Sequence, residues 1–279
     1  MKTVISASRR TDIPAFYLTW FMNAIRAGKL EVANPFYPKQ TRIVDLTPQA
    51  VGWIVFWSRN YGPFLRRHSF FDDYQLFFHF TILPPTKLEK VGVDVTTALN
   101  QMRRLVELYG GERVIWRYDP LVHWEENGRL ATNHQPEQFE ALCREIGSLG
   151  VSRCYFSFAH PYAKFIQRFR KKFPADRLID LPIDQKLDIA AQMARTAARY
   201  GLNLYSCCND RLLQAEGVHK GHCIDGGLLN RLRPEIRVSQ AKAPTRRDCG
   251  CTASIDIGSY VQQPCPYGCI YCYANPLWK

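Results

Sequence analysis

The sequence predicts an α/β fold, a full or partial TIM-like barrel of parallel strands with a cysteine-rich loop segment appended at its C-terminal end. Short apolar runs alternate with amphipathic segments over residues 3–206, as in strand–helix–strand units around a parallel sheet. The length of 279 residues suits one such barrel. Beyond residue 206 the alternation stops, and eight of the ten cysteines follow. We therefore expect a barrel over residues 1–206 and a cysteine-rich segment over residues 207–279, packed on it as one structural domain.

The expected strands are short apolar runs that end at a polar residue or a proline. The clearest is Trp53–Trp57, a continuous apolar run of the kind found in strands buried on both faces of a parallel sheet. The other expected strands are residues 3–6, 43–46, 76–83, 113–118, 151–158 and 202–206. Roughly six to eight strands fit a full or partial barrel.

Amphipathic helices are expected between these strands, at residues 15–26, 94–109, 136–149 and 184–200. In the second of them Leu99, Met102 and Val106 share one face, and Gly110 follows as a helix stop. Helices in these positions would be the crossover connections that parallel strands require.

Functional residues of a parallel barrel gather at the carboxyl ends of its strands. Those ends carry Arg9, Arg10, Asp12, Arg59, His79, Arg117, Asp119 and His160. Adjacent arginines are costly to bury without an anionic partner, so Arg9, Arg10 and Asp12 are the candidate catalytic or substrate-positioning residues. We interpret Arg59, Arg117 and Asp119 as candidate cofactor-binding residues. Two structural alternatives stay open: Arg117 pairs with Asp119, and His79 is a hydrogen-bonded core residue.

The most specific motif is a C-x3-C-x2-C spacing formed by Cys265, Cys269 and Cys272. Thiolates hold iron–sulfur clusters, and closely spaced ones can bind a single cluster from one loop. Gly268 lets the loop fold back, and two flanking prolines oppose a helix. Three ligands leave one iron of a four-iron cluster without a protein ligand, which is a position for chemistry.

This spacing, with Tyr271 directly before the last cysteine, resembles the cluster motif of radical SAM enzymes. The run Gly-Cys-Ile-Tyr-Cys-Tyr-Ala is similar to the motif of the spore photoproduct lyase-like branch. The resemblance implies that Cys265, Cys269 and Cys272 bind a [4Fe-4S] cluster, that S-adenosylmethionine binds the open iron, and that Tyr271 lies near its adenine. It also implies an electron donor such as a ferredoxin or flavodoxin.

The position of the motif is unusual for that superfamily. Radical SAM enzymes usually carry the motif after the first strand of the barrel, whereas here it begins fifteen residues from the end. Over nearly its full length, from Ser8-Arg9-Arg10-Thr11-Asp12 to the cysteine loop, the chain resembles the family called domain of unknown function 1848. That family has the same C-terminal arrangement and no established reaction.

Five further cysteines lie in the C-terminal segment: Cys207, Cys208, Cys223, Cys249 and Cys251. Cys249-Gly250-Cys251 suits two ligands on one metal. With Cys223 and either Cys207 or Cys208, four thiolates are available for a second, fully ligated [4Fe-4S] cluster. Zinc is an alternative, because four thiolates also form zinc sites, and Cys207 or Cys208 is alternatively a small buried residue. Cys143 and Cys154, in a helix and a strand, are expected in the core.

The formal net charge of +12 indicates an anionic partner or substrate. Basic residues cluster at 164–172 and 231–247, although a solvated surface explains them equally well. The sequence shows no nucleic-acid-binding motif, so nucleic acid is a partner without motif support. No apolar run approaches the ~18 residues of a membrane span, and the N-terminus lacks a signal peptide, so we expect a cytoplasmic protein.

The favoured interpretation is a radical SAM-type iron–sulfur enzyme whose substrate the sequence does not identify. One alternative is a non-catalytic electron carrier or redox sensor with two clusters. Another is a zinc-stabilised nucleic-acid-binding protein. The metal content and the presence of an open coordination position separate the three.

Overall fold

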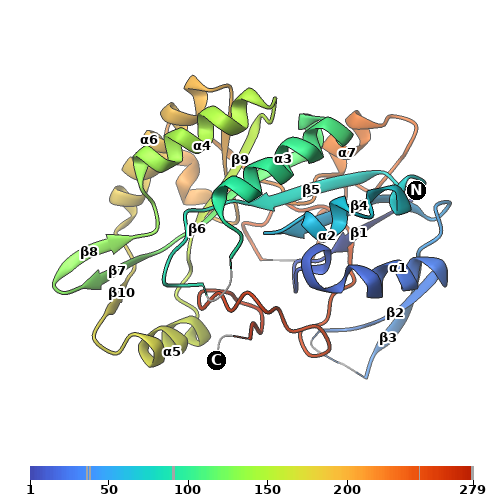
Figure 1. The fold of residues 1–279 in the computed structure, drawn as a ribbon, viewed down its shortest axis with the longest axis horizontal. Coiled ribbons are helices and arrows are strands. Elements are labelled where there is room, and N and C mark those ends of the chain that lie inside the picture. Colours follow the sequence, from blue (N-terminus) through green and yellow to red (C-terminus); the bar gives the residue numbers. More distant parts are fainter. Residues whose placement is uncertain (36, 38, 90–91, 245, 278–279) are drawn as a thin grey trace.

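The computed structural model describes residues 1–35, 37, 39–89, 92–244 and 246–277. An eight-stranded sheet with the order β12-β11-β9-β6-β5-β4-β1-β13 forms its centre, and all neighbouring strands are parallel (Figure 1). Its strands are β1 (Thr3–Ala7), β4 (Val51–Ser58), β5 (Leu76–Thr81), β6 (Val114–Leu121), β9 (Arg153–Phe158), β11 (Asn203–Ser206), β12 (Val218–Lys220) and β13 (Ile255–Asp256). The prediction of an α/β fold around a large parallel sheet is confirmed. In the described part of the chain β12 and β13 are the sheet's edges, and no strand pairing joins them.

The helices are α1 (Leu18–Arg26), α2 (Gly62–Leu65), α3 (Val95–Tyr109), α4 (Pro136–Ser148), α5 (Ala163–Lys172), α6 (Ile183–Arg199) and α7 (Gly226–Leu232). All four expected helices are present, the first of them beginning as a π-helical turn at Ile13–Tyr17. Asp94 caps α3 by accepting a hydrogen bond from Thr97 N at 2.8 Å. Among the described residues, none of the helices has the length and apolar character needed to cross a lipid bilayer.

Two small antiparallel sheets accompany the main one. The first pairs β2 (Lys29–Ala33) with β3 (Thr41–Asp45), and the second has the order β10 (Arg177–Ile179), β7 (His123–Glu126), β8 (Arg129–Thr132). Of the first sheet, only the second strand was predicted from the sequence. A signal for the hairpin of β7 and β8 was present, because Asn127-Gly128 is a preferred two-residue turn and both residues have positive φ, 53° and 72°.

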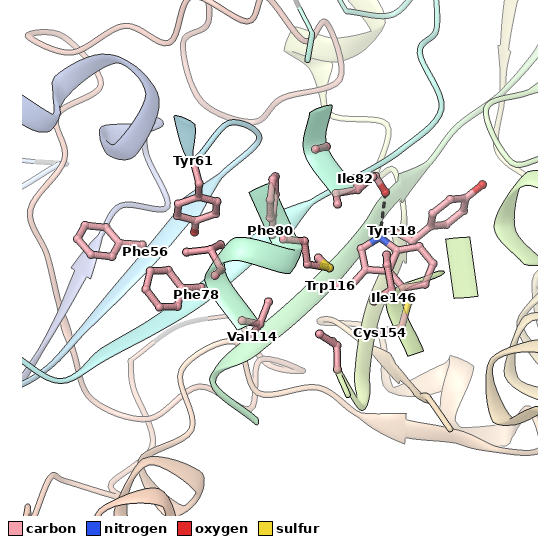
Figure 2. Close-up of a cluster of buried hydrophobic side chains, with 14 of the residues drawn as sticks. Phe56, Tyr61, Phe78, Phe80, Ile82, Val114, Trp116, Tyr118, Ile146 and Cys154 are labelled. Atoms are coloured by element: carbon pink, nitrogen blue, oxygen red, sulfur yellow. Dashed lines mark hydrogen bonds between the residues drawn. The ribbon is translucent and has the colours of Figure 1, made fainter. Parts of the chain in front are cut away.

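The main sheet buries side chains on both faces. Along β4, Ile54 and Phe56 enter the larger core, while Trp53 and Val55 enter a second core on the opposite face. Figure 2 shows part of the larger core, where aromatic rings pack edge to face and the Trp116 indole donates to the Ile82 carbonyl oxygen at 3.0 Å. This alternation of burial explains the continuous apolar runs in the sequence.

Residues from the cysteine-rich segment cover the second face of the sheet. Ile224, Leu228 and Leu229, in and just before α7, belong to the same buried cluster as Trp53 and Val55. The segment also supplies both edge strands, β12 and β13, where the sequence analysis expected only loops. It is therefore an integral part of the sheet's packing.

Candidate metal centres

The carboxyl ends of the parallel strands bring together many of the polar residues expected to be functional. Ser8 follows β1, Arg59 follows β4, Asp119 lies near the end of β6, and Cys207 follows β11. Parallel strands end at the same edge, so these residues lie along one side of the sheet. The cysteine loop, residues 264–277, follows β13 and lies beside α5 at this side (Figure 1).

Main-chain contacts fix the cysteine loop to the rest of the fold. Ile270 N donates to the carbonyl oxygen of Leu88 at 3.0 Å, and the Tyr17 hydroxyl donates to that of Pro264 at 2.6 Å. Gly268 has a φ of 62°, in the left-handed region that glycine adopts without strain. The predicted role of this glycine in folding the loop back therefore agrees with its backbone conformation.

Arg168 of α5 holds the loop from a third direction. Its side chain is buried, and its guanidinium donates to the carbonyl oxygens of Cys272 at 2.6 Å, Ala274 at 3.1 Å and Ile270 at 3.5 Å. In the sequence Arg168 belongs to the basic cluster at residues 164–172, which suits an anionic partner. In the structure this arginine is a structural residue, because its hydrogen bonds go to the main chain of the loop.

A buried network lies beside the second cysteine of the loop. Arg59 Nη1 lies 3.0 Å from Glu89 Oε1, 2.7 Å from the Tyr271 hydroxyl and 3.8 Å from Cys269 Sγ. The Tyr271 hydroxyl in turn donates to Glu89 at 2.5 Å. Burial raises the pKa of Cys265 and Cys269 to about 12, so a metal bound there has to displace protons from these thiols. Glu89 was missed because it lies in an irregular segment without a motif.

The remaining C-terminal cysteines form a closed ring of thiol contacts, here called the cysteine ring, in the order Cys207, Cys223, Cys251, Cys249, Cys208 and back to Cys207. The Sγ atoms of Cys207 and Cys223 are 3.1 Å apart, and the other neighbours in the ring lie close enough to shift the pKa of one another's thiols. Three stretches of chain contribute, which follow β11, β12 and α7. The structure therefore brings together Cys223, Cys249 and Cys251 with both of the cysteines considered as the fourth ligand, Cys207 and Cys208.

Local backbone features build the cysteine ring. Cys208 has a φ of 56°, a left-handed conformation uncommon outside glycine. A Cβ on Gly250 would lie 2.9 Å from the ring of His222, so only glycine fits between Cys249 and Cys251 without a shift. These two features fix the main-chain conformation at Cys208 and between Cys249 and Cys251.

Arg117 connects the cysteine ring to the end of β6. Its Nη1 lies 3.2 Å from Cys223 Sγ, while Nη2 pairs with Asp119, which also accepts a hydrogen bond from Ser157. The guanidinium also lies over the Trp57 ring, 5.5 Å from the centroid. Arg117 and Asp119 are thus an ion pair, as one alternative held, and this pair directly contacts a cysteine.

His79 lies beneath the cysteine ring and is fully buried. It stacks on Trp57 at 3.9 Å, and Nε2 lies 2.7 Å from the carbonyl oxygen of Cys223, so this nitrogen carries the proton. Burial and the nearby Arg117 lower the pKa of His79 to about 3, and the imidazole is neutral. Within the described residues His79 Nδ1 has no hydrogen-bond partner. His79 is thus a hydrogen-bonded core residue, as one alternative held, and it contacts the main chain of Cys223.

Arg9 and Arg10 meet the carboxylate of Asp256 at the end of β13. Arg9 N donates to Asp256 at 2.8 Å, and the Nε atoms of Arg9 and Arg10 lie 3.5 and 3.7 Å from its carboxylate oxygens. Ser6 and Ser8 donate to the same carboxylate at 2.9 and 2.6 Å. Asp256, which the sequence analysis missed, is the anion that accompanies the paired arginines. Their role toward substrate stays a prediction.

Asp12 is buried between the turn after β1 and the end of β4. Its carboxylate accepts hydrogen bonds from Ala15 N at 2.9 Å, Arg59 N at 2.9 Å and the Ser58 hydroxyl at 2.8 Å. Burial raises the pKa of Asp12 to about 7, although these hydrogen bonds oppose the shift. This arrangement fixes the main chain of Arg59 next to the cysteine loop, and a catalytic role for Asp12 stays a prediction.

The donor chemistry of both cysteine groups fits an iron–sulfur cluster. Within the residues that the structure describes, no three His, Cys, Asp or Glu side chains are placed to hold a single metal ion. A cluster contains several metal atoms with one thiolate on each, so its ligands need not converge on one point. The loop offers three thiols and the cysteine ring offers five.

His160 follows β9 and makes an edge contact with Tyr162, at 4.6 Å between ring centroids.

Comparisons with known proteins give a family and no activity. No curated protein matches the chain. Solved structures that match include a crystal structure of D-hydantoinase, with 10% sequence identity and a TM-score of 0.32 over 61% of this chain. The chain spans 38% of the length of that protein. The profile of the family described as domain of unknown function (DUF1848) matches residues 4–274, and the chain belongs to this family.

Proposed function

We propose that the protein is an iron–sulfur enzyme of the radical SAM type that acts on an anionic substrate. Cys265, Cys269 and Cys272 would hold a [4Fe-4S] cluster, and four thiols of the cysteine ring would hold a second one. The observation that carries the proposal is the pinned C-x3-C-x2-C loop at the carboxyl edge of the sheet, beside Arg59. When bound, the cluster at the loop would supply one-electron chemistry on S-adenosylmethionine.

The residues of the chain would position the reactants and keep water out of the site. Arg168 and the contact between Ile270 and Leu88 hold the loop in one conformation, as a bound cluster requires. Arg9 and Arg10 would orient anionic groups, because the single carboxylate of Asp256 faces both of them. The Tyr271 hydroxyl is held by Arg59 and Glu89, so Tyr271 would meet the adenine through its ring.

The wider features of the proposal follow from the same interpretation. We infer a partial TIM-type barrel, whose second face is filled by the C-terminal segment, in a cytoplasmic protein. A ferredoxin or flavodoxin would supply the electron. These features do not depend on the cysteine chemistry, so evidence against any of them would leave the cluster proposal standing.

The first experiment measures metal content after anaerobic purification and reconstitution. Wild-type protein should bind iron and acid-labile sulfide, and the triple variant C265A/C269A/C272A should lose about one cluster. The matched control is C143A/C154A, which removes two buried cysteines that lie in α4 and β9 outside both groups. Iron-free protein, or equal iron in the triple variant and wild type, would contradict the proposal.

The second experiment tests the open coordination position. Reduced, loaded protein is incubated with S-adenosylmethionine while the electron paramagnetic resonance signal and the release of 5′-deoxyadenosine are followed. A changed signal or released deoxyadenosine supports the enzyme. An unchanged signal without deoxyadenosine, with cell extract present as a substrate source, would instead favour an electron carrier.

The cysteine ring leaves room for a second candidate, a structural zinc site, which would require four of its thiols to move together onto one point, because the described side chains are not placed to hold a single metal ion. Its thiols come from three stretches of chain, and zinc–thiolate sites commonly join such stretches. Zinc that resists chelation in C265A/C269A/C272A and is lost from C249A/C251A would establish this alternative for the ring, leaving the loop proposal to the iron analysis.

A further inference from the structure

Two buried arginines at the edge of the sheet share one arrangement. Each joins a carboxylate on one side to a cysteine sulfur on the other: Asp119 to Arg117 to Cys223, and Glu89 to Arg59 to Cys269. The side chains of Arg117 and Arg59 are only 11% and 15% exposed. The two groups therefore present the same buried cation to a thiol in each candidate centre.

Further contacts fix the direction of each guanidinium. Ser157 donates to Asp119, and the Trp57 ring lies below Arg117. Tyr271 bonds to both Glu89 and Arg59. In Arg117 the carboxylate binds Nη2 and leaves Nη1 for the sulfur of Cys223, so this contact is built into the fold. In Arg59 the same Nη1 serves Glu89, Tyr271 and Cys269, so the contact with sulfur is the longer and weaker one.

We propose that Arg117 and Arg59 are positioning residues that donate hydrogen bonds to the metal-bound thiolates of Cys223 and Cys269 and raise the reduction potential of each centre. The inference rests on the proposed function. Reduction adds negative charge to a centre, and a hydrogen-bond donor with a positive charge at a ligand sulfur stabilises the reduced form. The contact is 3.2 Å at Cys223 and 3.8 Å at Cys269, so the larger effect belongs to the cysteine ring.

The test is a redox titration of fully loaded protein, monitored by electron paramagnetic resonance. In Arg117→Gln, reduction of the ring centre should become at least tenfold less favourable, which is a shift of about 59 mV to lower potential for one electron. The loop centre should keep its potential. Arg59→Gln should give the reverse pattern with a smaller shift. Arg113→Gln is the matched control, because Arg113 lies before the other end of β6 and packs on Trp53.

A second variant keeps the test valid if Arg117→Gln destabilises the fold. Arg117→Gln leaves Asp119 buried without its cation, so R117Q/D119N removes both charges. In R117Q/D119N the tuning hydrogen bond is absent, and the two lost charges offset each other. The ring potential should therefore still fall, although less than in Arg117→Gln. Arg117→Lys, which keeps the charge, should fall between wild type and Arg117→Gln.

The outcomes separate this inference from the proposed function. If both centres hold iron and the reduction potential of the ring centre is the same in wild type and Arg117→Gln, the inference is overturned while the proposed function stands. The same holds if Arg113→Gln lowers the ring potential as much as Arg117→Gln does. If the ring holds zinc, which has no redox chemistry, the inference is overturned for Arg117, and only Arg59 at the loop centre still tests it. A ring that binds neither metal overturns both the second centre and the inference drawn for Arg117.

Discussion

Replacing Arg168 by methionine should loosen the cysteine loop while leaving the sheet intact. Methionine keeps an unbranched apolar side chain at this position of α5. It removes the guanidinium, which donates to the carbonyl oxygens of Cys272 and Ala274 at 2.6 and 3.1 Å. A hydrogen bond to a charged group contributes about 1.5–3 kcal/mol, so two short ones contribute about 3–6 kcal/mol. Water can reach the loop once it opens, so we expect the lower end. A loss of about 3 kcal/mol makes opening of the loop roughly a hundredfold more favourable.

Hydrogen exchange of the metal-free protein measures this opening directly. The amides of Ile270, Cys272 and Leu277 donate to main-chain carbonyls and should be protected in wild type. In Arg168→Met these amides should exchange about a hundredfold faster, with little change in β4 or β5. Arg170→Met is the control, because Arg170 is an exposed residue of the same helix. Unchanged exchange in the loop, or equal loosening in Arg170→Met, would refute the reasoning.

Two other predictions concern the turn at Asp12 and the cysteine ring. Because the pKa of Asp12 is raised from 3.8 to about 7, its contribution to stability is present below pH 4 and lost as the pH rises to 7, by at most about 4 kcal/mol. Urea unfolding at pH 5 and pH 8 should show that Asp12→Asn loses less stability than wild type over this interval, and an equal loss contradicts the assignment. Gly250→Ala should cost about 1–3 kcal/mol and reduce the metal bound by the ring, because its Cβ meets the His222 ring. Gly92→Ala, which adds its Cβ in open space, is the control. Equal melting temperatures and metal contents in Gly250→Ala and Gly92→Ala would contradict the prediction for Gly250.

The parallel sheet was predictable because its central strands are long apolar runs. In β4 both faces are buried, so the strand is apolar throughout and ends abruptly at Ser58 and Arg59. The edge strands β12 and β13 have only three and two residues, and runs this short carry no periodic signal. Helix α5 was missed because Phe165 and Phe169 are its main apolar residues within a basic run.

The same limits apply to the candidate site. The rule that functional groups lie at strand ends selected Arg59 and Arg117, and both contact a cysteine sulfur in the structure. Glu89 lies in an irregular segment and Asp256 in a two-residue strand, so neither has a local pattern. The role of Arg168 depends on a contact with residues more than a hundred positions later, which composition and periodicity do not encode.

The strand order accounts for the late position of the cysteine motif. Along the sheet the order is β13, β1, β4, β5, β6, β9, β11, β12, so every strand except β13 follows the order of the sequence. The last strand of the chain thus occupies the first place in space, in register with β1 through Ile5 opposite Ile255. The loop after β13 consequently leaves at the carboxyl edge, next to the loops that carry Arg9 and Arg59. The cysteine motif, which follows the first strand in radical SAM enzymes, can therefore lie at the carboxyl edge beside β1 here, although it is at the end of the sequence. This placement accounts for the unusual position of the motif in the sequence and favours the proposed enzyme over a peripheral electron-carrying appendage.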